Sequence, residues 1–126
     1  MKDLDGPIEA FEWSRFQING QIHSAEGQGA GKDIFLWDGR VSSWTARKGH
    51  QLKPNMVASA CKEDIEILVI GNGVHGAIEV TEKTKETIRA AGIKKVIIQK
   101  TPEACVTYNR YIHEGANVAL LAHGTC

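Results

Sequence analysis

The chain has 126 residues, enough for one domain with its own core, and its hydrophobic fraction of 42% is typical of globular rather than disordered proteins. Fifteen basic and fifteen acidic side chains give a formal charge of zero, which argues against a dedicated nucleic-acid binder, because neutralising phosphates takes a basic excess or a basic face. We therefore expect a single domain over residues 1–126, with little self-repulsion to oppose association.

The cysteines and the N-terminus indicate the compartment. Cys61, Cys105 and Cys126 are odd in number, far apart and free of C-x-x-C spacing, which favours a reducing compartment over a disulfide framework. The N-terminal run MKDLDGPIEAF lacks the apolar core of a signal peptide, and no stretch approaches the ~20 apolar residues of a membrane span. We predict a cytoplasmic protein without a membrane partner, with Cys61 and Cys105 in its core.

The first half of the chain is predicted to be rich in strands, because its apolar residues alternate between turn signals. The predicted elements, in chain order, are alternating runs between Phe11 and Ile18, a turn at Asn19-Gly20, a glycine-rich loop over Glu26–Asp33, a hairpin of Asp33–Trp37 and Val41–Thr45 around Asp38-Gly39, a loop from Ala46 to Lys53 and a short helix from Pro54.

The second half is predicted to be β-α-β-α-β. Its expected strands are Ile65–Ile70, Ile93–Gln99 and Val118–Leu121, with one helix capped by Thr81 and ended by Gly92, and another starting at Thr101-Pro102-Glu103 with Thr101 as N-cap. Strands joined by such crossovers share a C-terminal edge, where open α/β sheets tend to bind ligands. The sequence leaves the direction of the last strand open, and an antiparallel strand would move His123 to the opposite edge.

Several segments together resemble a known family. They are LVIGNG (Leu68–Gly73), AAGIKKVIIQ (Ala90–Gln99), TPEACVTYN (Thr101–Asn109) and HGTC (His123–Cys126), with Trp13, Trp37, Trp44 and His50 at further matching positions. In order and spacing they resemble the adipogenesis-associated Mth-domain-containing family, a domain of unknown function that includes a mitochondrial complex I assembly factor. The resemblance implies a small three-layer α/β domain with a mixed central sheet, a β-rich N-terminal half and a tendency to form homodimers, and it implies no established activity.

A glycine-rich motif, G-x-G-x-x-G over Gly71–Gly76, directly follows a predicted strand. Dinucleotide binding needs a helix that opens at the third glycine and an acidic residue at the end of the next strand. β-Branched residues follow Gly76, and Gln99-Lys100 stands where the acid should be. We therefore expect no dinucleotide cofactor and interpret the glycines as a turn out of the sheet, whose amides remain a candidate anion site.

The candidate ligand-binding residues are Gly71, Asn72, Gly73, His75, Trp44, Arg47 and His50. His75 can change protonation near neutral pH, which suits acid–base chemistry or anion binding, although an exposed loop histidine is the simpler interpretation. The tryptophans are expected either to line a pocket or interface or to fill the core, and Arg47 to stack on Trp44.

Two further groups of residues receive structural interpretations. His123 and Cys126 form H-x-x-C, but two ligand-type residues do not make a zinc site, so we expect no metal and a tail that packs against the sheet. The cations Lys85, Arg89 and Lys94–Lys95 are interpreted as solvated faces.

These observations predict an uncharacterised α/β domain that acts through protein–protein contacts, of an assembly or regulatory type, as a homodimer. The alternative is a small-molecule or anion-binding protein, enzymes included, with its site at the Gly71–Gly76 loop. No motif in the sequence decides whether the protein is an enzyme.

Overall fold

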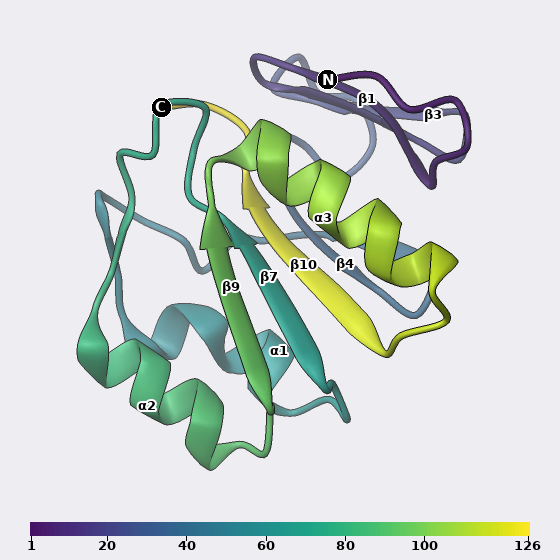
Figure 1. The fold of residues 1–126 in the computed structure, drawn as a ribbon. Helices are drawn as coiled ribbons and strands as arrows, with labels where there is room; N and C mark the ends of the chain where they lie inside the picture. The colour runs from purple at the N-terminus through teal and green to yellow at the C-terminus, as the bar shows by residue number, and fades with distance from the viewer.

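The computed structural model describes residues 1–126, and its centre is a five-stranded sheet in the order β5-β4-β10-β7-β9 (Figure 1). The strands are β4 (Asp33–Trp37), β5 (Arg40–Ser43), β7 (Ile67–Gly71), β9 (Lys95–Gln99) and β10 (Val118–His123). β10 runs parallel to β7 and antiparallel to β4, which settles the direction of the last strand and confirms the predicted mixed sheet. His123 therefore lies at the same edge of the sheet as the Gly71–Gly76 loop.

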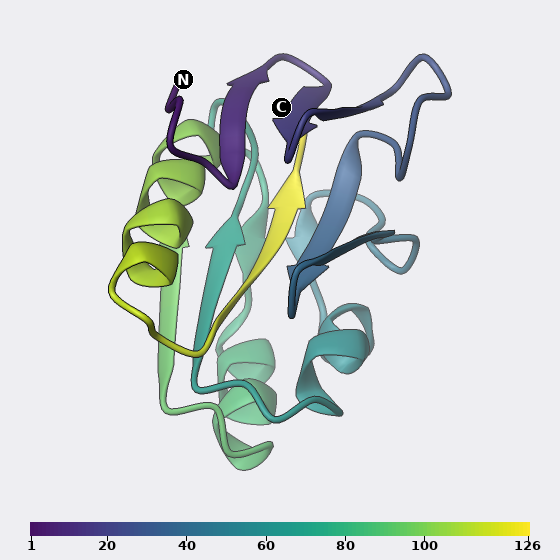
Figure 2. The ribbon, with the colours of Figure 1, turned by 90° about the vertical axis from the view of Figure 1, so that its right-hand side faces the viewer.

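The remaining elements cover the two faces of this sheet and give three layers (Figures 1 and 2). One face carries a small antiparallel sheet of β1 (Ile8–Glu12), β2 (Arg15–Ile18) and β3 (Gln21–Ser24), together with α3 (Thr101–His113). The other carries η1 (Pro54–Val57), α1 (Ala58–Cys61), α2 (Glu82–Ala90) and a two-stranded ribbon of β6 (Gln51–Leu52) and β8 (Glu79–Val80). The short β6 lies inside the segment predicted as a loop.

The period of two in β10 explains why this strand lies at the centre. Val118, Leu120 and Ala122 pack toward α3 and the small sheet, whereas Ala119 and Leu121 pack toward α2. All six residues of the strand are buried, as expected for a strand covered on both faces. His123 continues the second series and therefore faces the α2 side, as does Asp33 on the neighbouring strand.

The two long helices begin as the sequence predicts, with one correction. Thr81 caps α2, accepting the amide hydrogen of Thr84 at 3.2 Å. Thr101 was expected to cap α3 but is its first helical residue, and the N-cap is Lys100. The Thr101 side chain turns inward because two buried main-chain groups lie within its reach and would otherwise lack a partner.

The three cysteines are free thiols. Cys105 is fully buried in α3, and burial raises the pKa of its thiol to about 12. Cys61 packs at the margin of the other core, where burial also raises its pKa. No helix has both the length and the apolar character needed to cross a bilayer.

Candidate functional site

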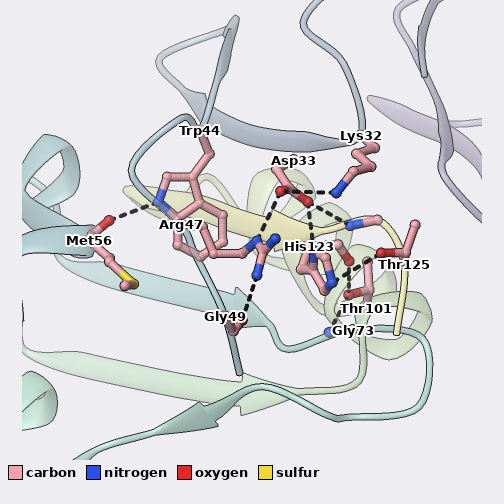
Figure 3. Close-up of polar contacts among 11 residues, drawn as sticks. Lys32, Asp33, Trp44, Arg47, Gly49, Met56, Gly73, Thr101, His123 and Thr125 are labelled. Carbon is pink, nitrogen blue, oxygen red and sulfur yellow. Dashed lines mark hydrogen bonds and ion pairs between the residues drawn. The ribbon is translucent and has the colours of Figure 1, made fainter. Parts of the chain in front are cut away.

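A buried carboxylate–imidazole pair lies where the start of β4 meets the end of β10. Asp33 and His123 are paired in the antiparallel register, and Oδ1 of Asp33 lies 2.7 Å from Nδ1 of His123 (Figure 3). The Gly124 amide donates to the same oxygen at 3.2 Å. Asp33 is 13% exposed and His123 only 4%, so both groups are largely removed from water.

Cations hold the second oxygen of the Asp33 carboxylate. Nε of Arg47 donates to Oδ2 at 2.9 Å, and Nζ of Lys32 lies 3.6 Å from it. Burial alone would raise the pKa of Asp33, but the hydrogen bonds and charges of His123 and Arg47 outweigh it and hold this pKa well below its usual range. Asp33 is therefore ionised at neutral pH, and Nδ1 of His123 must carry the hydrogen that it receives.

The other nitrogen of His123, Nε2, lies 3.1 Å from the Thr125 hydroxyl oxygen. A hydroxyl, an imidazole and a carboxylate in this order resemble the relay that hydrolases use to activate a nucleophile. None of these three residues, however, lines any of the five surface depressions. In this geometry the arrangement fixes the segment after β10 to the start of β4.

The residues from the end of β10 onward, His123–Cys126, lie in the Gly71–Gly76 loop and form its tail. The Val74 amide donates to the Thr125 oxygen at 3.0 Å, and the amides of His75 and Ala77 donate to the Cys126 oxygen at 3.0 and 3.2 Å. The loop amides that could bind an anion are thus already bound to the chain itself. An anion could use them only by displacing the tail, as the packing interpretation of HGTC implies.

Close approaches explain the first two glycines of the motif, Gly71 and Gly73. Gly71 lies against Thr101, whose hydroxyl donates to the His123 oxygen at 2.7 Å and accepts from the Gly73 amide at 3.0 Å. Gly73 has a φ of +107°, and a Cβ atom there would collide with the main chain of Cys126. After Gly76 the chain enters β8, and no helix opens at the third glycine. Gly71 makes room for α3 and Gly73 for the tail, rather than for a pyrophosphate.

An exposed tryptophan lies over this edge of the molecule. Trp13 occupies the tight turn between β1 and β2, is 52% exposed, and its ring centroid lies 6.0 Å from that of His75. The turn is fixed to the tail, since the Ser14 amide donates to the Gly124 oxygen at 2.7 Å. Cys126 is also exposed here. We call the surface of Trp13, His75 and Cys126 the Trp13–His75 face.

The sequence from Ile8 to His123, from the first residue of β1 to the last of β10, matches the model of a family described as proteins of unknown function, DUF498/DUF598. The chain belongs to the DUF498/DUF598 family. No activity, substrate or partner accompanies that description.

Solved structures share the DUF498/DUF598 fold. A conserved hypothetical protein from Pyrococcus horikoshii OT3 is 22% identical, with a TM-score of 0.73 over 94% of this chain and 98% of that one. A Bartonella henselae protein described as an outer membrane protein is 21% identical, with a TM-score of 0.77 over 95% of each chain. A Mth938-like domain from Bordetella pertussis is 17% identical, with a TM-score of 0.64 over 93% of this chain and 84% of that one. The fold and the resemblance to Mth-domain proteins are confirmed.

In this DUF498/DUF598 domain the predicted site residues do not form one site. Trp44 is 3% exposed and donates from Nε1 to the Met56 oxygen, so it belongs to the core. The expected stacking of Arg47 on Trp44 is wrong, because Arg47 bonds Asp33 and the Gly49 oxygen, and both cation–π contacts of the structure involve Tyr111. His50 lines an open basic depression of about 630 Å³ beside Lys48 and Lys53, which contains none of the other candidates.

Of the loop candidates, Gly71 and Gly73 are buried, Asn72 is half-buried and His75 is exposed. The residues that the sequence analysis did not assemble are Asp33, Thr101 and Thr125. The sequence predicts a last strand that ends near His123 and another strand that starts at Asp33. It does not indicate that these two strands are neighbours in the sheet.

Proposed function

We propose that this single domain acts in the cytoplasm through protein–protein contacts as a homodimer, and that the Trp13–His75 face is its contact surface. The observation that carries the proposal is Trp13, a large aromatic side chain left half in water at the tip of a tight turn. Tryptophan is the residue type most enriched among binding hot spots, and its burial by a partner removes a large apolar area from water.

The geometry around Trp13 supports a contact role because the turn is already rigid. Ser14 holds it at both main-chain groups: its amide donates to Gly124, and its oxygen accepts the amide hydrogen of Ala25 at 3.1 Å. A partner that covers Trp13 therefore orders few additional groups, and less conformational entropy opposes binding. The neutral charge of the chain offers little repulsion between two copies.

Two further features favour this function and compartment over the alternative. Three free cysteines suit a reducing compartment. The alternative, anion binding by the Gly71–Gly76 amides, has less support because those amides already donate within the chain, the Val74 and His75 amides to the tail. The Trp13–His75 face, by contrast, needs no rearrangement before it can be covered.

Sedimentation equilibrium over a concentration series tests the homodimer. We expect the wild type to dimerise and Trp13→Ala to weaken the dimer by about 2 kcal/mol, roughly thirtyfold in dissociation constant, as for a typical hot spot. Val106→Ala, which truncates a side chain of matched exposure (53%) on α3, should leave the dimer unchanged. A wild type that stays monomeric at every concentration, or equal weakening by both variants, would contradict the proposal.

A further inference from the structure

The strand β9 is an open edge of the central sheet. Its only neighbour in the sheet is β7, so no strand pairs with its other side, and Figure 1 shows α2 near its first residues. The Lys95 amide donates to the Glu66 oxygen, and the Gln99 oxygen accepts from the Asn72 amide, so both residues turn their main-chain groups toward β7. Because these directions alternate along a strand, Val96 and Ile98 turn their N–H and C=O groups outward.

A groove of about 360 Å³ lies along this edge. It is lined by Lys85 and Arg89 of α2 and by Lys94, Lys95, Val96 and Ile98 at β9. The half-buried side chains of Val96 and Ile98 form its apolar part. Free strand groups and two apolar side chains thus share one groove.

The charge of the groove is entirely positive. Lys85 is paired with Glu82 at 3.0 Å, and Nζ of Lys95 donates to the Tyr111 hydroxyl at 2.9 Å, but Arg89 and Lys94 have no carboxylate within 4.0 Å. In a chain of zero net charge this is a local excess of cations beside an unpaired edge. The lysines that were interpreted from the sequence as solvated surface residues line one groove in the fold.

We propose that this groove binds an extended acidic segment of another protein, which adds to β9 as a sixth strand of the sheet. Its main chain would pair with the outward groups of Val96 and Ile98. Of its side chains on the α2 face, the central ones would cover these two residues, and flanking carboxylates on the same face would meet Arg89 and Lys94. The groove is separate from the Trp13–His75 face, so this inference goes beyond the proposed function and does not depend on it.

The same observations disfavour two other occupants. A second copy paired through its own β9 in the antiparallel sense would bring Lys94 and Lys95 toward Lys100 of the first, and lysines at an edge strand are a known obstacle to such pairing. Single-stranded nucleic acid binds grooves that combine cations with stacking aromatic rings, and no aromatic side chain lines this one.

The test is fluorescence anisotropy with a labelled peptide that carries valine at two alternate central positions and glutamate at the alternate positions on either side, so that both residue types lie on one face of the strand. We expect saturable binding, lost with a valine–glutamine peptide, and about tenfold weaker or more for the double variant Arg89→Glu/Lys94→Glu, since each reversal replaces an attraction by a repulsion. The matched control Lys48→Glu/Lys53→Glu makes the same charge change in the other basic depression and should bind as the wild type does.

Amide NMR locates the peptide. The Val96 and Ile98 amides should shift and become protected from exchange, and Val96→Pro, which removes one outward N–H and spares the bonds to β7, should weaken binding. If circular dichroism shows that Val96→Pro is unfolded, the exchange protection of the Val96 and Ile98 amides in the wild type decides whether the peptide pairs with β9. No binding, equal weakening by both charge-reversal pairs, shifts elsewhere, or an oligothymidylate that competes at equal concentration would overturn the proposal. Trp13→Ala should not affect the peptide, so this result and that for the homodimer can fail separately.

Discussion

Two edges of the molecule differ in whether a sequence motif coincides with groups that are free to bind a ligand. One is the tail edge, where Gly71–Gly76 meets His123–Cys126, and the other is the lateral edge at β9. The tail edge carries the sequence pattern of a phosphate-binding loop, yet the loop amides already donate within the chain, those of Val74 and His75 to the Thr125 and Cys126 oxygens. The β9 edge carries no motif, yet it leaves strand groups and two cations without partners. A sequence motif reports which groups could bind, whereas only the fold shows which are still free.

The largest expected effect on stability comes from removing the charge of the Asp33 carboxylate, which fixes the tail edge to β4. Asp33→Asn leaves Arg47 without its carboxylate, and we expect the free energy of unfolding in urea to fall by about 3 kcal/mol, as for a broken buried pair. Asp38→Asn, which removes an exposed carboxylate paired with Arg40 in a hairpin turn, should change it by less than about 0.5 kcal/mol. Equal effects of the two variants would show that the Asp33 network does not hold the tail edge.

A somewhat smaller effect is expected where the tail meets the loop. Gly73→Ala forces a left-handed φ on alanine and a collision with Cys126, so we expect a loss of about 2 kcal/mol in unfolding free energy. Gly27→Ala also has a positive φ, of +86°, but open space around it, and should cost about 1 kcal/mol. The difference between the two losses of unfolding free energy measures the contact between Gly73 and Cys126. If the tail does not lie against the loop, this difference is zero.

The smallest expected effect is a decrease in the free energy of unfolding at acidic pH. Because the pKa of Asp33 is depressed in the folded state, its contribution is complete above the ordinary value of about 3.9 and is lost as pH falls toward the folded-state value. We expect urea unfolding to show about 1 kcal/mol of this loss below pH ~4, discounted for partial exposure. The same titration of Asp33→Asn should be flatter, and parallel curves would contradict the assignment.

Local signals predicted the elements well. The hairpin around Asp38-Gly39, the Thr81 cap and the start of α3 each depend on a few neighbouring residues, and each lies where the sequence places it. The role of Thr101 was wrong because capping is a local preference, whereas the inward bonds of Thr101 depend on the end of β10, 22 residues further along.

The candidate site was less predictable because its contacts are remote in sequence. Asp33 and His123 are 90 residues apart, and their meeting depends on β10 entering between β4 and β7. Likewise, helix periodicity places Lys85 and Arg89 on the outside of α2 but does not say that β9 will form the other wall of a groove.

The central place of β10 also has a consequence for how the molecule folds. β4 and β7 contact each other through β10, a strand that begins only at Val118, so the sheet stays split into two halves until that segment has left the ribosome. Pairings this distant in sequence are slow to form, and the strand edges of both halves stay exposed meanwhile. During synthesis, the period before residues 118–123 emerge is therefore when this chain is most prone to aggregate.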